Sequence, residues 1–139
     1  MNKLITLLLL LSICFLYSCA DRSYTGSYYI GNQSTHRITL EFYDYGELNN
    51  SFSLNQEEED LLEVTVWAGI REAPIYTNDS IVVTYDDSIS FTHLNIQSEL
   101  TGRNIYWNQN WQILKDQKYR KDWEYVFTDD DYEEALSNQ

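Results

Sequence analysis

Side chains that commonly carry out catalysis are few in this chain, and their spacing does not match a known catalytic motif. The two histidines, His36 and His93, lie in or beside alternating apolar segments, with no cysteine and no H-x-x-x-H spacing near them. Neither therefore predicts a zinc site. No serine lies in a G-x-S-x-G turn, the arrangement that exposes a nucleophile in many hydrolases. We expect no catalytic residue, no metal ligand and no cofactor, and we predict that the protein is not an enzyme.

Two runs of consecutive carboxylates, residues 57–60 and 129–131, are the other candidates for metal chemistry. Calcium prefers several oxygen ligands, and the D-x-D-x-D-G spacing points those oxygens at one centre. Neither run has that spacing, and consecutive carboxylates on a loop point in several directions. Calcium binding stays an open alternative, with solvated charge as the simpler interpretation.

The residue with the clearest chemical role is Cys19, which lies where an N-terminal apolar segment ends. Lys3 precedes the apolar run 4–15, which is followed by small and polar residues. The run is about a dozen residues long, well short of the ~20 that a membrane-spanning helix needs. We therefore interpret residues 1–18 as a secretory signal peptide.

The residues Leu-Tyr-Ser-Cys at positions 16–19 resemble a lipobox, the recognition site of lipoprotein signal peptidase. This resemblance implies cleavage before Cys19, diacylation of its thiol and acylation of the new amine with a fatty acid such as palmitate. The alternative is ordinary signal peptidase cleavage after Ala20, because Ser18 and Ala20 are spaced like an A-x-A site. We favour lipidation because a cysteine lies at the end of the apolar run.

Lipidation of Cys19 would leave the exported domain without a free thiol, because Cys14 lies in the signal peptide. Two or more acyl chains give a stable membrane anchor, whereas a single chain gives a marginal one. We predict a lipidated tether over residues 19–24, with the membrane as partner through the lipid on Cys19. Ala20, rather than Asp, follows the cysteine, which favours the outer membrane of the cell envelope.

The exported part is strongly acidic. Without Lys3, eight basic side chains stand against 22 acidic ones. A net negative charge of this size repels other polyanions. We therefore expect no binding to nucleic acid, and repulsion from anionic lipid headgroups.

Short alternating segments rich in aromatic and β-branched residues predict the fold. Ile38, Leu40 and Phe42 alternate with polar residues, which is the period-two pattern of a strand with one buried face. The other segments of this kind lie at 28–30, 52–54, 62–66, 81–85, 89–91 and 123–127, with turn residues at 31–32, 46–50, 78–79 and 86–87. We predict a mainly β fold, an antiparallel β-sandwich of about seven strands in a single domain over residues 25–139, with a hairpin at 86–87.

A short C-terminal helix should complete this domain. Thr128 can cap a helix whose first turn holds the carboxylates 129–131, which complement the exposed N–H groups there. Tyr132, Ala135 and Leu136 have the spacing of one helix face. We expect this face to pack on the sheet.

The end of the chain carries a family resemblance. Residues 125–135 read YVFTDDDYEEA and are preceded by DSIVV at 79–83 and RNI at 103–105. Together with the lipobox, these motifs resemble a group of small uncharacterised lipoproteins from Bacteroidota, over roughly residues 60–139. The resemblance implies an envelope location and a β-rich domain, and no activity.

Two tripeptides, 79–81 and 87–89, match the Asp-Ser/Thr-aliphatic pattern at which Bacteroidota O-glycosylate exported proteins. They make Ser80 and Ser88 candidate O-glycosylation sites. The alternative is that Asp-Ser simply leads from a turn into a strand.

Three aromatic residues, Tyr106, Trp107 and Trp111, form the most suggestive binding cluster. Residues 104–114 predict either a short helix, on which the two tryptophans would share a face, or an irregular segment. Exposed rings on a β-sandwich can stack on sugars, whereas packing in the core is the alternative.

We therefore expect a membrane-anchored cell-envelope lipoprotein with a non-catalytic, structural or interaction role. The alternative is a glycan-binding lipoprotein of a polysaccharide-capture system, for which Trp107 and Trp111 must be exposed together.

Overall fold

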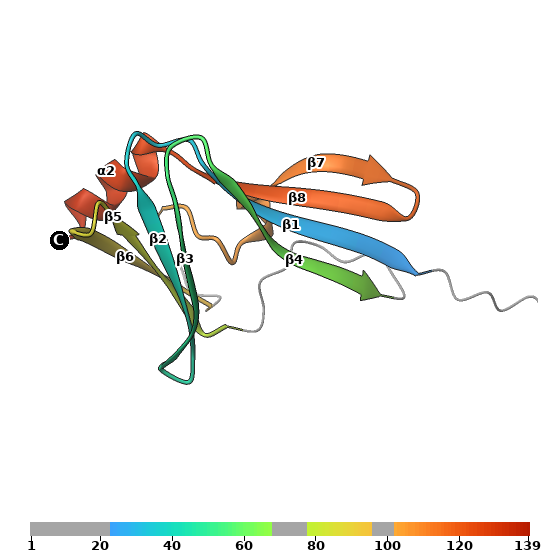
Figure 1. The fold of residues 1–139 in the computed structure, drawn as a ribbon, viewed down its shortest axis with the longest axis horizontal. Helices are drawn as coiled ribbons and strands as arrows, with labels where there is room; N and C mark the ends of the chain where they lie inside the picture. Colours follow the sequence, from blue (N-terminus) through green and yellow to red (C-terminus); the bar gives the residue numbers. More distant parts are fainter. Residues whose placement is uncertain (1–22, 68–77, 96–101) are drawn as a thin grey trace, which may run out of the picture.

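Two four-stranded sheets pack face to face in the computed structural model, which describes residues 23–67, 78–95 and 102–139 (Figure 1). Sheet A has the order β4 (Glu59–Trp67), β1 (Tyr24–Asn32), β8 (Arg120–Phe127) and β7 (Gln112–Gln117). Sheet B has the order β3 (Glu47–Leu54), β2 (Ile38–Asp44), β5 (Ser80–Tyr85) and β6 (Ile89–Leu94). A single-turn 3-10 helix, η1 (Asn108–Asn110), precedes β7, and helix α2 (Asp129–Ser137) ends the chain. The predicted mainly β sandwich with a short C-terminal helix is confirmed.

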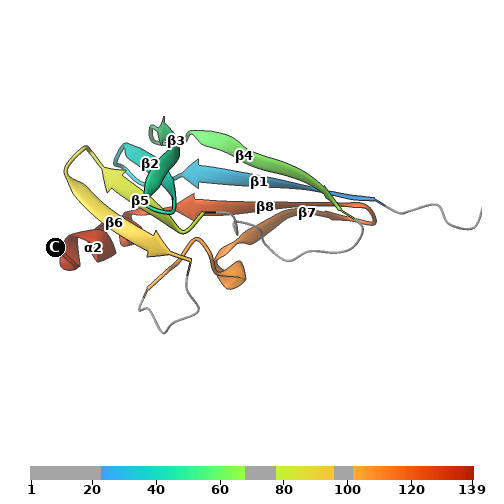
Figure 2. The ribbon, with the colours of Figure 1, turned by 90° about the horizontal axis from the view of Figure 1, so that it is seen from below.

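Strand pairing is antiparallel in the described residues except between β1 and β8, which run parallel. The first strand of the domain therefore lies in the middle of sheet A, between β4 and the last strand. Because β1 and β8 run in the same direction, both begin at one end of the sheet. That end extends beyond sheet B, whose strands cross those of sheet A steeply (Figures 1 and 2).

One core lies between the two sheets and explains the alternation in the sequence. Sheet A contributes Tyr28, Ile30, Trp123, Tyr125 and Phe127, and sheet B contributes Ile38, Leu40, Phe42, Leu54, Ile81, Val83 and Tyr85. Within sheet A the rings of Tyr28 and Trp123 stack with centroids 5.0 Å apart. Large aromatic side chains thus supply much of the apolar area that this domain buries.

The tight hairpins use residues in left-handed backbone conformations. Asp86 and Asp87, with φ of 47° and 58°, connect β5 to β6, which confirms the predicted hairpin. Tyr45 and Gly46 do the same between β2 and β3, with φ of 51° and 79°. Two successive positive φ angles match the twist of the adjoining strands. The structure thus ends the turn at Gly46, and residues 47–50, predicted as turn, belong to β3.

Helix α2 begins as predicted, with Thr128 as its N-cap and three carboxylates in the first turn. The N–H of Thr128 donates to Asp131 Oδ2 at 2.8 Å, which completes a capping box. Ala135 is fully buried and Tyr132 packs against the core, but Leu136 is 44% exposed. The predicted packing of Leu136 is therefore wrong, and the buried Asp131 takes its place on the inner face.

Residues 104–114 do not form the helix that was one of the two expectations. Only the 3-10 turn η1 is helical there, and β7 begins at Gln112. β7 was not predicted, because its residues are mostly exposed on both faces and lack apolar alternation. Residues 31–32, predicted as a turn, also belong to a strand, because β1 continues through Asn32.

Candidate functional site

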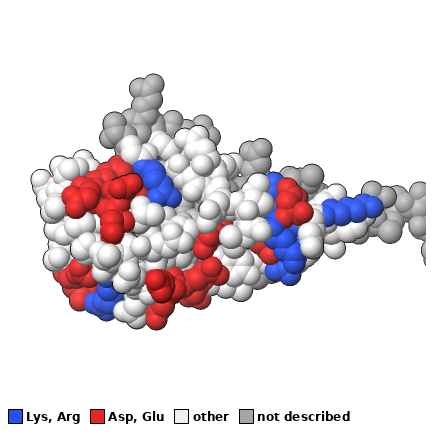
Figure 3. Space-filling model, turned by 90° about the horizontal axis from the view of Figure 1, so that it is seen from above, with Lys and Arg blue, Asp and Glu red and all other residues white. Residues whose placement is uncertain are grey.

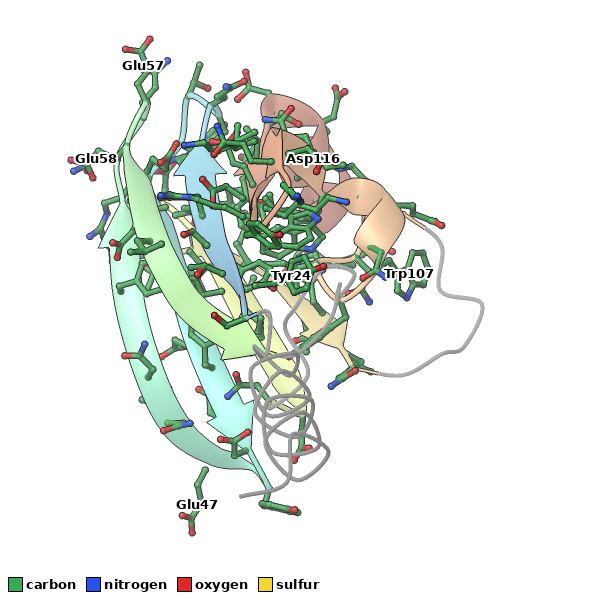
Figure 4. The ribbon with its side chains drawn as sticks, turned by 90° about the vertical axis from the view of Figure 1, so that its right-hand side faces the viewer. Tyr24, Glu47, Glu57, Glu58, Trp107 and Asp116 are labelled. Atoms are coloured by element: carbon green, nitrogen blue, oxygen red, sulfur yellow. The ribbon has the colours of Figure 1, made fainter. Side chains whose placement is uncertain are left out.

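A polar cleft of about 460 Å³ opens where β1 ends and β4 begins. It is lined by Gly31, Asn32, Gln33, Gln56, Glu57, Glu58, Glu59 and Glu124. We call it the acidic cleft. Its Glu57 and Glu58 lie on the opposite side of the domain from Trp107 (Figure 4).

Backbone hydrogen bonds hold the wall of the acidic cleft. The N–H of Glu57 donates to the carbonyl of Asn32 at 2.7 Å, and the N–H of Asn32 donates to the carbonyl of Glu58 at 2.9 Å. The Glu58 carboxylate accepts from the backbone N–H of Asn55 at 2.7 Å and from its side-chain amide at 3.1 Å. These bonds to Asn55 lower the pKa of Glu58. The turn between β3 and β4 is thus stabilised by its own side chains.

Gly31 lines the cleft and makes room for Glu124. A Cβ at this position would lie 3.0 Å from Glu124 Oε1. In the ladder Gly31 is opposite Glu59, so two carboxylates approach each other across the bare backbone of a glycine.

Glu59 and Glu124 form a carboxyl pair. Burial, followed by the hydrogen bond and the negative charge of Glu124, raises the pKa of Glu59. Glu59 is exposed, whereas Glu124 is buried and accepts a hydrogen bond from the side-chain amide of Gln112. Such a pair can share a proton and can accept hydrogen bonds from hydroxyl or ammonium groups. In the described segments, no three His, Cys, Asp or Glu side chains are grouped so that they could hold a metal ion.

The aromatic residues predicted to contact glycans differ in how far they are exposed. Tyr106 and Trp111 are 6% and 7% exposed and belong to the core, whereas Trp107 is half-buried. The indole Nε1 of Trp111 donates to the carbonyl of Ile105 at 2.6 Å. The expectation that Trp107 and Trp111 share a helix face is wrong, because only a 3-10 turn lies between them. The jointly exposed pair that sugar stacking requires is not formed.

The two candidate O-glycosylation sites differ in accessibility. Ser88 is exposed in the β5–β6 turn, where its N–H donates to the carbonyl of Tyr85 at 3.0 Å. Ser80 is half-buried and is opposite Leu94 in the ladder between β5 and β6. Ser88 is therefore the more accessible acceptor, and its modification stays a prediction.

Neither histidine contributes to the acidic cleft. His36 stacks on Tyr132 with ring centroids 3.7 Å apart, and its Nδ1 lies 2.6 Å from Asp86 Oδ2. The hydrogen bond with His36, together with the N–H of Arg37, lowers the pKa of Asp86. These contacts join the β1–β2 loop to helix α2 and to the β5–β6 turn. His93 is buried among aromatic rings.

Basic side chains gather at the end of sheet A where β1 and β8 begin. Four of the six Lys and Arg residues in the described segments lie on β7, on β8 or in the turn between them: Lys115, Lys118, Arg120 and Lys121. We call this region the basic end. Figure 3 shows blue side chains gathered at one end of the body with a few red ones among them, while larger red groups lie farther along the body. Composition alone could not reveal this arrangement, because the net charge of the chain is −13.

Cys19 lies outside the described residues, and β1 begins five positions after it, at Tyr24. Among the described helices, none has the length and apolar character to span a bilayer. Comparison with protein-family models, with curated proteins and with solved structures finds no match to this chain. A functional assignment therefore depends on the residues and geometry of the chain itself.

Proposed function

We propose that the protein is a lipid-anchored component of the cell envelope with a structural or interaction role. The observation that carries this proposal is the short distance between Cys19 and the folded domain. Tyr24 is the first residue of β1 and follows Cys19 by five positions. Even a fully extended tether of that length spans only about 18 Å. A lipid on Cys19 would hold this end of sheet A close to the bilayer surface.

The way β1 is built into the domain supports an anchoring role. β1 is hydrogen-bonded on both sides, to β4 and to β8. Beyond the ladder, the N–H of Thr25 donates to the carbonyl of Tyr119 at 2.9 Å. A pull on the tether would therefore act on a central strand rather than on an edge strand. A central strand cannot separate without breaking the bonds on both of its sides.

The polar interior supports a structural rather than a catalytic role. The side chain of the buried Asn32 donates to the carbonyls of His36 and Leu54 at 2.8 and 3.1 Å. Its Oδ1 accepts from the N–H and the hydroxyl of Ser34 at 3.0 and 2.7 Å. These bonds tie the end of β1 to sheet B. The glycan-binding alternative is not favoured, because the indole of Trp111 is buried and hydrogen-bonded.

The test is the mass of the N-terminal peptide from a detergent-extracted envelope fraction, compared with Cys19→Ala. We expect acyl mass on Cys19 in the natural chain, and loss of both processing and membrane retention in the variant. Cys14→Ala is the matched control, because it removes the other thiol and should leave acylation unchanged. An unlipidated chain that begins at Asp21 would refute the proposal and make the protein a secreted one.

A further inference from the structure

Charge is divided unequally between the ends of this domain. The segment 112–121 carries four basic side chains and one acidic one. The other described residues carry two basic and eighteen acidic side chains. The domain therefore has a positive end and a negative remainder, although its net charge is strongly negative.

Within the basic end, some basic side chains already form an ion pair with a carboxylate of the domain and others do not. Arg120 forms an ion pair with the buried Asp122 at 2.9 Å, so its charge is largely used inside the domain. Lys121 lies 3.8 Å from Asp116, at the limit of an ion pair. Lys118 is exposed in the turn between β7 and β8, and it takes part in no ion pair within the described part of the chain. Lys118 and, more weakly, Lys121 are thus available to an outside anion.

Two tyrosines lie beside these lysines at the tip. The rings of Tyr24 and Tyr119 pack at a tilt with centroids 5.7 Å apart, and Tyr119 is 40% exposed. The ammonium group of Lys118 lies 5.3 Å from the centre of the Tyr119 ring. Tyrosine is enriched at membrane interfaces, because its ring is apolar and its hydroxyl is polar. The tip therefore combines cationic and interfacial aromatic groups.

The basic end is also the end to which the anchor would connect. Tyr24 is at the tip, and the bond from Thr25 to Tyr119 fixes the β7–β8 turn beside the start of β1. Figure 4 views the molecule from this end, with Tyr24 near the middle of the view. A lipid on Cys19 would therefore bring Lys118 and Tyr119 toward the bilayer, together with the end of β4, where Trp67 is opposite Tyr24.

The acidic side chains nearest the tip, Asp116 and Asp122, lie beside Lys121 and Arg120, and the carboxylates of α2 are too far away to cancel the charge of Lys118. β8 has eight residues and spans about 26 Å, so the carboxylates that open α2 lie about that far from the tip. The Debye length at physiological ionic strength is about 8 Å. The negative potential of the distant carboxylates is therefore screened, while the lysines at the tip act at close range. The repulsion from anionic headgroups that the net charge predicts does not apply to this end.

We infer that the basic end, with Lys118 and Tyr119 at its tip, contacts the anionic phospholipid headgroups of the membrane that holds the lipid anchor. This inference rests on the proposed anchor and adds a second, electrostatic contact that orients the domain. The acidic cleft and helix α2 then face away from the membrane surface.

The test uses the lipidated chain, after removal of its signal peptide, in vesicles of phosphatidylcholine with and without phosphatidylglycerol. A fluorophore on Gln117→Cys reports the distance of the tip from a headgroup-attached quencher, and Glu133→Cys on α2 is the matched reporter at the other end. Labelling is specific, because Cys19 is acylated and Cys14 is removed with the signal peptide. We expect phosphatidylglycerol to increase quenching at position 117 only, and high salt to abolish the increase.

The charge dependence is tested with two substitutions that each remove one positive charge. A basic side chain at an anionic surface contributes ~1 kcal/mol, so Lys118→Gln should lower the ratio of contacting to free orientations about fivefold. Arg37→Gln, in the loop that leads into β2, should leave the ratio unchanged. Equal quenching in both lipids, or equal effects of the two substitutions, would overturn the inference while the anchor stands. A chain that fails to float with either vesicle would instead refute the proposed anchor.

Discussion

The burial of His93 makes the stability of this domain depend on pH. The imidazole is 4% exposed, and its Nδ1 has no hydrogen-bond partner among the described residues. The rings of Phe91, Tyr125 and Phe127 surround it, with centroids 5.2, 6.4 and 6.1 Å away. Burial, and secondarily the positive charge of Arg103, lowers the pKa of His93 to about 4. The folded state therefore keeps this histidine neutral where an unfolded chain would protonate it.

The sign and size of the effect follow from proton linkage. Below the unfolded pKa of about 6.5, the unfolded chain binds a proton that the folded chain excludes, so stability falls as the pH falls. The loss continues until the folded pKa of about 4 is reached. Between about pH 7 and about pH 5, the contribution of His93 alone is a loss of about 2 kcal/mol. For a domain of marginal stability this is a large fraction of the total.

Urea unfolding, followed by tryptophan fluorescence, measures this loss in an unlipidated chain that begins at Ala20. His93→Leu keeps an apolar side chain of similar volume and removes the titration. The stability difference between the natural chain and this variant should therefore change by about 2 kcal/mol between the two pH values. Ile81→Val is the matched control, because Ile81 is buried opposite His93 and should give a constant offset of about 1 kcal/mol. Parallel pH profiles for the natural chain and His93→Leu would refute the reasoning.

Three further substitutions test the polar contacts, each by urea unfolding against a matched control. Asn32→Ala should cost about 3 kcal/mol because it leaves buried hydrogen-bonding groups without partners, whereas the exposed Asn49→Ala should change stability by less than about 0.5 kcal/mol. Asp131→Asn should cost about 2 kcal/mol, because it weakens both the capping box and the ion pair with Arg103 at 2.6 Å. An equal loss of stability in the exposed Asp130→Asn would contradict this explanation. Glu57→Gly should stabilise the domain by about 1 kcal/mol, because Glu57 has a φ of 63°, which glycine adopts without strain. If Glu57→Gly stabilises the domain no more than the neighbouring Gln56→Gly, the backbone at Glu57 is not strained.

The parts of the fold that the sequence predicted are those where burial is one-sided. Ile38, Leu40 and Phe42 all point into the core, and the polar residues between them point outward, so their alternation is visible without a structure. Thr128 and the carboxylates after it likewise predicted the start of α2, because capping depends on neighbouring residues alone.

The parts that were missed depend on contacts between distant residues. β7 is an edge strand with two mostly exposed faces, so nothing in its own residues marks it as a strand. Asn32 was interpreted as a turn residue, whereas its amide is buried between the sheets. Local sequence cannot distinguish an asparagine in a turn from one buried between sheets, because in both places its side chain forms hydrogen bonds with backbone groups.

The candidate sites were missed for the same reason. Glu59 and Glu124 meet only because β1 separates their strands by one position in sheet A. The four basic residues of the basic end are visible in the sequence, but the net charge does not show that the fold separates them from most of the acidic residues. Cys19 is the opposite case, since its prediction depends on the adjoining residues alone.

The parallel pairing of β1 with β8 also determines the order in which the domain can be completed. The strands of sheet B come from two hairpins that precede β8 in the chain, so sheet B can form before β8 is available. One side of β1 has no partner until β8, Arg120–Phe127, becomes available. During that interval the first strand of the domain exposes unpaired backbone groups along one side. A chain truncated before β8 would leave one side of β1 open, and this open strand would be a site for aggregation or proteolysis.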